Sequence, residues 1–481
     1  MALATFGESL IERKQDRSLG PRLARAWTVS ADGLTYTFDM RTDVKWHDGT
    51  PYTAEDAKFT LEQVIRDGSI NVRFAQWRGI IDKMEVPSPE RLVLRLKKPD
   101  ISAIFGLAAP GPATQAVFSK TYITTAGEDA AAAKPIGTGP WKFVEYKPAE
   151  LLRATAVEGH WRQTPYFQEL VIRQVPEDAT RLAMVLRGEA DLAQVGLSAT
   201  KQLKDAGLNL FVQPNSYALI ISLQGQYLPT RAKFSKAVPW AADPADATAW
   251  ARARKVREAL DISIDRKAIV DTILAGQAVP AAYPYAVPGS PFEDPSFKVP
   301  TYDVNRAKQL LADAGYTNGF DMNLLLVEAG SRPLAPEVGQ AVAQYWQAIG
   351  VRVKQSRADF TATVRAGTID RSLAGNAFTF GLFTYDEPVV GHVGNFSSGA
   401  DTLLGAEYPP LDDLIAKANG TADAEARRKI QIDMGKMVLD QHFMIGVAWV
   451  HSLIAGGKRV KTLPQVSGVT GFHNFEYASS E

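Results

Sequence analysis

Residues 33–41 read Gly-Leu-Thr-Tyr-Thr-Phe-Asp-Met-Arg, and residues 45–51 read Lys-Trp-His-Asp-Gly-Thr-Pro. Apolar and polar side chains alternate through the first run, which predicts a strand with one buried face. His47-Asp48-Gly49 has the composition of a turn. Thr53, followed three residues later by Asp56, is typical of the start of a capped helix. A strand, a turn and a helix are therefore expected in that order.

The length and composition describe a large globular protein. The chain has 481 residues, which exceeds one ordinary domain, so two or three hydrophobic cores are expected. Hydrophobic residues make up 46% and charged residues 22% of the sequence. The 53 basic and 53 acidic residues balance, so no net field favours nucleic acid or an anionic membrane. No stretch approaches the ~20 apolar residues that a membrane span needs.

The sequence contains no cysteine. This excludes disulfides, thiolate metal sites, a cysteine nucleophile and a lipidated N-terminal cysteine in this chain. The absence also fits a periplasmic protein, because such proteins often lack free thiols in an oxidising compartment. Residues 1–8 lack the basic region and the long apolar core of an export signal, so no signal peptide is read here.

The pattern of predicted elements changes along the chain. Strands and turns dominate up to residue 165, and strands and helices alternate from residue 166 onward. Asp303 is placed to cap a helix that stops at Gly315. Apolar residues at spacings of three and four predict another helix over 337–349. The alternation indicates a mixed α/β protein.

Several further segments match one known family in the same order. Together with residues 33–51, they resemble the family 5 extracellular solute-binding proteins, the oligopeptide-, dipeptide- and nickel-binding class of ABC importer receptors. No single segment is specific, but their order through nearly the whole chain makes chance similarity a poor explanation. The segments are Pro135–Phe143, Gly188–Asp191, Val256–Lys267 and Lys458–Phe475.

The resemblance implies a two-lobed, α/β periplasmic-binding-protein-like fold with an extra N-terminal subdomain, three domains in all. Such receptors close on a ligand between the lobes by hinge motion. The polar stretch 239–250 is interpreted as a connection between the lobes. The predicted domains are a discontinuous core of lobe 1 (1–24, 166–250 and 447–481), an accessory subdomain of lobe 1 (25–165) and lobe 2 (251–446).

The resemblance assigns a ligand role to Arg332. Peptide receptors of this family hold the ligand carboxylate with an arginine that opens an Arg-Pro pair, and the matching pair here is Arg332-Pro333. The planar guanidinium binds a carboxylate through two parallel hydrogen bonds. From the spacing alone, the alternative is a solvated arginine beside the helix 337–349.

The chain departs from the family at Thr384. Aligned on Glu387-Pro388, the aspartate that binds a peptide ammonium falls on Thr384, and Asp386 replaces it only if the backbone shifts register. A threonine cannot neutralise a buried cation, which is costly to leave unpaired. The departure therefore favours a ligand with an anionic or hydroxyl-rich end, such as an opine, a sugar conjugate or a blocked peptide.

The remaining candidate ligand residues are Gly381, Phe383, Tyr385 and Trp449. Alternation around the first three predicts a strand with one face in the core, so most aromatic residues of this segment are expected to be structural. Tyr385 points to the opposite face from Thr384 and is a candidate wall of the site. Trp449 fits either the core or the site.

The histidines and carboxylates do not form a catalytic or metal motif. No pair of histidines has metal spacing, although the nickel-chelate branch of the family uses isolated histidines and keeps His392 and His442 open as candidates. No Gly-x-Ser-x-Gly elbow occurs. Neighbouring acids such as Asp412-Asp413 lend no specific support to a glycosidase.

The sequence therefore predicts a monomeric, periplasmic solute-binding protein that is not an enzyme and uses no cofactor and no metal. Its expected partners are a small-molecule ligand and the permease subunits of an ABC importer, with no nucleic acid. The alternatives are a nickel-chelate or oligosaccharide receptor of the same fold, a receptor that signals instead of importing, and a carboxylate-dependent hydrolase.

Overall fold

The computed structural model describes residues 6–14, 18–67, 77–109, 116–328, 334–385, 387–400, 402–465 and 475–481. It divides into two compact units. The chain passes from one to the other within two long strands, β12 (Asn209–Leu223) and β17 (Met444–Gly456), and also on either side of the short segment 420–422. Unit 1 comprises 1–213, 420–422 and 452–481, and unit 2 comprises 214–419 and 423–451.

The strand and the turn predicted over residues 33–51 are confirmed. Strand β4 (Thr35–Met40) buries every second side chain, as the alternation requires. In the turn, Gly49 donates its N–H to Trp46 O at 2.8 Å and has a φ of +89°. That positive φ is a left-handed conformation that glycine adopts without steric cost.

The predicted helices are also confirmed. Helix α2 (Ala54–Ile65) begins where the capping pattern placed it, and Asp56 Oδ2 accepts a backbone N–H from residue 53 at 2.9 Å. Asp303 caps α12 (Val304–Asp313) by accepting the N–H of Arg306 at 2.8 Å. The helix predicted over 337–349 is α13 (Ala335–Ala348).

Small sheets make up much of unit 1. Their strand orders are β3-β4-β6-β5 and β10-β9-β8, both antiparallel, and β2-β1-β7. The strands are β1 (Ile11–Arg13), β2 (Leu19–Pro21), β3 (Ala24–Val29), β5 (Ile81–Ser88), β6 (Arg91–Leu96), β7 (Ala108–Ala109), β8 (Trp141–Lys147), β9 (Leu151–Ala156), β10 (Glu169–Arg173) and β11 (Leu192–Val195). The helices besides α2 are α4 (Trp77–Ile80), α5 (Ser102–Phe105), α6 (Lys120–Ala126), α7 (Glu128–Ala133), α8 (Asp178–Leu186) and α9 (Thr200–Asp205).

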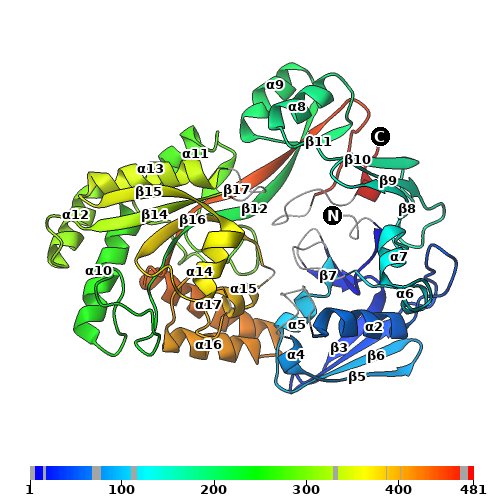
Figure 1. The fold of residues 1–481 in the computed structure, drawn as a ribbon, viewed down its shortest axis with the longest axis horizontal. Coiled ribbons are helices and arrows are strands. Elements are labelled where there is room, and N and C mark those ends of the chain that lie inside the picture. The colour runs from blue at the N-terminus through cyan, green and yellow to red at the C-terminus, as the bar shows by residue number, and fades with distance from the viewer. Residues whose placement is uncertain are drawn as a thin grey trace. The chain divides into compact units, whose positions relative to one another are not determined.

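One mixed sheet organises unit 2. Its strand order is β17-β12-β16-β14-β15, with β13 on the other side of β17 and β11 of unit 1 pairing with the end of β17. Helix α13 packs along β14, β15 and β16 (Figure 1). The strands are β13 (Ala278–Pro280), β14 (Asp321–Glu328), β15 (Arg352–Asp359) and β16 (Asn376–Phe383), and the other helices are α10 (Ala247–Ile262), α11 (Arg266–Thr272), the π-helix Phe360–Arg365, α14 (Ala366–Ile369), α15 (Pro388–Asn395), α16 (Pro409–Asn419) and α17 (Ala424–Asp440).

The stretch interpreted as a connection lies within unit 2. The predicted boundary at 250/251 falls inside α10. Trp240 is buried, donates its indole N–H to Gln224 O at 3.0 Å and packs against Phe320. Residues 214–250 thus belong to unit 2, and the predicted division into lobe 1 and lobe 2 stays a prediction. The separate subdomain 25–165 stays a prediction.

The mixed α/β class predicted from the sequence is confirmed by these sheets and their covering helices. Over the stretches that the structure describes, every helix is too short or too polar to serve as a membrane span.

Candidate functional site

Parallel pairing brings the carboxyl ends of three strands of unit 2 to one edge of the sheet. Strand β14 runs parallel to β16, with Leu326 opposite Thr379, and parallel to β15, with Glu328 opposite Asp359. In open α/β sheets, ligands bind just outside the carboxyl ends of such strands. We call this edge the carboxyl edge. It is the place where the topology favours a site.

Strand β16 carries the predicted residues to this edge. Gly381 and Phe383 are in β16, and Phe383 lies opposite Tyr217 of the antiparallel strand β12. Thr384 and Tyr385 follow directly. Thr384 is only 3% exposed, whereas Phe383 and Tyr385 are half-buried, so the aromatic residues present more of their surface than the threonine does.

Trp449 lies on β17, opposite Val279 of β13, and is 2% exposed. Two residues further along, His451 Nδ1 accepts the backbone N–H of Asn215 at 3.1 Å, which holds β17 against the middle of β12. Strand β12 lies between β17 and β16 in the sheet, so Trp449 and Phe383 lie on the two strands that flank β12. Arg332 and Asp386 lie outside the described residues.

Residues that the sequence did not single out fix Tyr385. Its ring stacks on Tyr285, with centroids 5.8 Å apart and planes 20° apart. Asn395 Nδ2 donates to the Tyr385 hydroxyl oxygen at 3.0 Å. Tyr285 lies in the proline-rich loop after β13, and Asn395 is the last residue of α15. The aromatic residues of that loop, Tyr283, Tyr285, Phe292 and Phe297, are a weak signal of packing, but nothing local indicates that Tyr385 is a partner.

His392 packs against Tyr285, with ring centroids 4.4 Å apart. Its side chain is fully buried, and burial lowers its pKa to about 4. Nδ1 donates to Pro388 O at 2.8 Å, because a carbonyl can only accept, and the neutral Nε2 then accepts from the Tyr283 hydroxyl at 3.1 Å. Both ring nitrogens of His392 are thus engaged in hydrogen bonds within the core.

His442 is also engaged elsewhere. Its Nδ1 lies 2.7 Å from Asp261 Oδ2, and Asp261 in turn pairs with the buried Arg266. Among the residues that the structure describes, no group of three or more histidines, aspartates and glutamates is arranged to hold a metal ion. The nickel-chelate alternative gains no support from these residues.

A buried ion pair anchors the segment after Tyr385. Arg427 of α17 binds Glu387 through two hydrogen bonds, Nε to Oε2 at 2.7 Å and Nη2 to Oε1 at 2.8 Å. Gln431 donates to the same Glu387 at 2.8 Å and accepts the N–H of Val389 at the same distance. The Glu387-Pro388 pair that carried the sequence alignment therefore has a structural role. It fixes the start of α15 beneath Tyr385.

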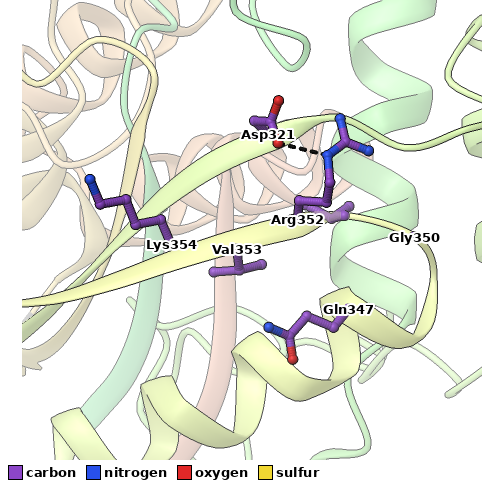
Figure 2. Close-up of a pocket in the computed structure, with 7 residues that line it drawn as sticks. Asp321, Gln347, Gly350, Arg352, Val353 and Lys354 are labelled. Carbon is purple, nitrogen blue, oxygen red and sulfur yellow. Dashed lines mark hydrogen bonds and ion pairs between the residues drawn. The ribbon is translucent and has the colours of Figure 1, made fainter.

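A surface pocket of about 460 Å³ lies at the opposite edge of the sheet, where β14 and β15 begin (Figure 2). We call this edge the amino edge. Arg352 Nε donates to Asp321 Oδ1 at 2.7 Å across the pocket, and Gln347 and Lys354 complete its polar lining. Both members of the ion pair are exposed, so water competes for each of them.

Comparison with known proteins assigns the family. Residues 18–382 match the bacterial extracellular solute-binding proteins, family 5. The chain belongs to this family. The resemblance stated from the sequence is thereby confirmed, and it covers the carboxyl edge as far as β16.

Two curated relatives illustrate the range of the family. The heme-binding protein A of Haemophilus influenzae is 26% identical over 463 residues, which cover 91% of this chain and 80% of that protein. The glutathione-binding protein GsiB of Salmonella typhimurium is 30% identical over 362 residues, covering 74% of this chain and 64% of GsiB. The match thus spans less than two thirds of GsiB.

Solved structures of other members share the fold. NikZ of Campylobacter jejuni in complex with Ni(L-His) aligns with a TM-score of 0.78 at 21% identity, over 99% of this chain and 94% of that one. DppA of Helicobacter pylori in complex with the peptide STSA aligns with a TM-score of 0.76 at 21% identity, over 97% and 91%. At this level of identity the alignments establish the fold alone.

Proposed function

We propose that this protein is a periplasmic receptor of an ABC importer that captures a small, peptide-like anionic ligand and delivers it unchanged to the permease subunits. It acts as a monomer by binding, without catalysis, and ligand binding closes its two lobes by hinge motion. Family membership supports the class of function, since the matched relatives carry the names of binding proteins.

The carboxyl edge is the observation that carries the proposal. The parallel strands β14 and β16 end there, Thr384 and Tyr385 follow β16, and Arg332 follows β14 by four residues in the sequence. In this proposal Arg332 binds an anionic group of the ligand. Gly381, Phe383, Tyr385 and Trp449 form the apolar surroundings of the ligand.

The peptide-like class is favoured over the alternatives. One relative is named for glutathione, and one solved structure with the same fold contains a peptide. The side chains of His392 and His442 form hydrogen bonds within the protein, which disfavours a nickel chelate as the ligand. Thr384 in place of an acid favours a peptide whose amine is blocked or an opine. An oligosaccharide or sugar conjugate is the second candidate, because the aromatic residues near Tyr385 also suit a sugar face.

Arg332→Ala and Arg332→Lys test this proposal. Native mass spectrometry of the purified protein identifies the co-bound ligand, and calorimetry then measures its affinity. Losing a bidentate charge-assisted contact is expected to cost about 2–5 kcal/mol. Arg352→Ala, at the amino edge, is the matched control and is expected to retain wild-type affinity. Wild-type affinity in both Arg332 variants contradicts the proposed role.

Scattering in solution tests the closure, which predicts a smaller radius of gyration with saturating ligand. An unchanged scattering profile contradicts it. Turnover of the co-bound ligand, followed by chromatography, would instead favour a hydrolase.

A further inference from the structure

Residue 215 departs from the regular geometry of the long strand β12. Asn215 has a φ of +50°, in the left-handed region, although it lies in the middle of the strand. Asparagine adopts this conformation more readily than other residues with a side chain, but the conformation still costs free energy. Residues held in this way persist where their surroundings fix them, and they gather at switch regions of proteins. The contacts of Asn215 therefore show what holds it.

One hydrogen bond, which we call the latch, holds Asn215 in this conformation. Its backbone N–H donates to His451 Nδ1 at 3.1 Å, so a side chain takes the place of a neighbouring strand. Nδ1 accepts because it carries no proton, and burial favours this neutral state by lowering the pKa of His451. The backbone N–H of His451 donates to Gln277 O at 3.1 Å, which fixes β17 at this residue within unit 2.

The left-handed residue lies where β12 passes from one unit to the other. On this strand unit 1 ends at Gln213, whose Nε2 donates to Oε1 of the buried Gln465 of the same unit at 2.5 Å. In unit 2, the regular pairing of β12 with β16 begins at Tyr217. Between these fixed points the φ of Pro214 is set by its ring, so a change in the course of the strand falls to the torsions beside it. Asn215 is the first residue after the crossing whose φ can rotate, and it already occupies a second allowed region.

The second long strand crosses between the units at the residue that holds Asn215. On β17, unit 2 ends at His451, so the latch joins the two long strands beside both of their crossings. If the φ of residue 215 rotates to an extended value while the sheet of unit 2 stays fixed, the preceding peptide turns its N–H away from His451 and the latch breaks. One hydrogen bond contributes about as much free energy as a left-handed residue costs. The two conformations of residue 215 are therefore close in free energy.

We propose that Asn215 is the hinge residue of β12 and that His451 is the positioning residue that latches it. With the latch formed, residue 215 stays left-handed and the course of β12 between the units is fixed. Without the latch, residue 215 also adopts the extended conformation, and the units change their relative orientation. This inference rests on the proposed function, in which the units close by hinge motion. It adds a device by which the hinge itself, and not the ligand alone, sets the populations of the receptor's conformations.

Two pairs of variants separate the latch from a general loss of packing. His451→Phe keeps a ring but accepts no hydrogen bond, whereas His451→Gln offers a neutral oxygen as acceptor and restores the latch. Asn215→Ala raises the cost of the left-handed conformation, whereas Asn215→Gly adopts it freely. His451→Phe and Asn215→Ala are therefore expected to release the hinge, and the other two variants to behave as the wild type. A glycine that resembles the wild type more than an alanine does is specific to a left-handed residue.

The measurement is the distribution of distances between the two units in the protein without ligand. The chain has no cysteine, so Lys83→Cys in unit 1 and Lys429→Cys in unit 2 give two unique sites for nitroxide labels. These lysine side chains are 62% and 72% exposed. Double electron–electron resonance then gives the distances. In His451→Phe and Asn215→Ala, the ratio of a second distance to the wild-type distance is expected to rise about twofold to tenfold, which is the effect of one hydrogen bond.

Equal distributions in the wild type and all four variants overturn the inference, and so does an Asn215→Gly that behaves as Asn215→Ala. Circular dichroism shows which variants fold, and each residue has its own pair, so one misfolded variant leaves the other pair to decide. Equal distributions together with closure in the scattering experiment reject the latch and leave the proposed function standing. Released variants without closure on the co-bound ligand reject the proposed closure and leave the latch standing.

Discussion

The two edges of the unit 2 sheet differ in how they hold their charges. At the carboxyl edge, Glu387 and Arg427 are 10% and 6% exposed and joined by two hydrogen bonds. At the amino edge, Asp321 and Arg352 are 82% and 58% exposed and line an open pocket. A hollow in the surface thus lies at one edge, and fixed, desolvated groups lie at the other. The comparison teaches that a hollow in the surface and a set of fixed, buried polar groups are separate features, and the proposed site relies on the second.

Breaking the buried pair is the strongest test of this difference. Glu387→Gln leaves Arg427 buried without its bidentate partner, and removing one member of such a pair typically costs about 3–5 kcal/mol. The loss is expected in the free energy of unfolding, measured in urea. Asp321→Asn, at the amino edge, is the control and is expected to shift the unfolding midpoint far less. Equal shifts in both variants would contradict the distinction between the two edges.

Much of the local structure was predictable because its signals are local. The alternation over residues 35–40, the glycine at position 49 and the cap at Asp303 each depend on neighbours a few residues away, and each prediction is confirmed. The stretch 239–250 resembles a linker in sequence because it is polar and carries prolines, yet its Trp240 is buried and α10 begins within it, at residue 247.

The candidate site was predictable only in part. The residues at the end of β16 were recognised through the resemblance, but their partners come from elsewhere in the chain. Asn395 and Tyr285 meet Tyr385 only because α15 and the loop after β13 pack together there. The partner of Glu387 is Arg427, 40 residues away. Such contacts depend on topology, and no spacing in the sequence specifies them.

The neutral state of His392 gives the second test, through pH. Its folded pKa of about 4 lies below the unfolded value of 6.5, so the unfolded chain binds the proton first as the pH falls. The contribution of neutral His392 to the free energy of unfolding is therefore fully present above pH 6.5. It is lost between pH 6.5 and 4, by about 3 kcal/mol in total. His392→Phe removes this loss while keeping a ring beside Phe396.

Unfolding free energies of the wild type and His392→Phe, measured in urea from pH 7 to pH 4, check this. The difference between the two proteins should change by about 3 kcal/mol across that range in favour of the variant. His451→Gln is the control. The pKa of His451 is also lowered by burial, but this residue is half-exposed, so the change should have the same sign and a smaller size. Parallel curves for the wild type and His392→Phe would show that His392 is protonated equally in both states.

The smallest effect is expected at the amino edge, from Asp321→Asn. Arg352 lowers the pKa of Asp321, so the pair contributes stability above the usual pKa of an aspartate and loses it as the pH falls through the lowered value. Both side chains are exposed, so water and salt screen their attraction, and the ~8 Å Debye length at physiological ionic strength limits its reach. Urea unfolding at pH 7 should therefore detect a slight shift at low salt that disappears in 1 M sodium chloride, and ligand affinity should stay at the wild-type value. Reduced ligand affinity in Asp321→Asn, at either salt concentration, would move the binding site to the pocket of Figure 2 and reverse the assignment of the two edges.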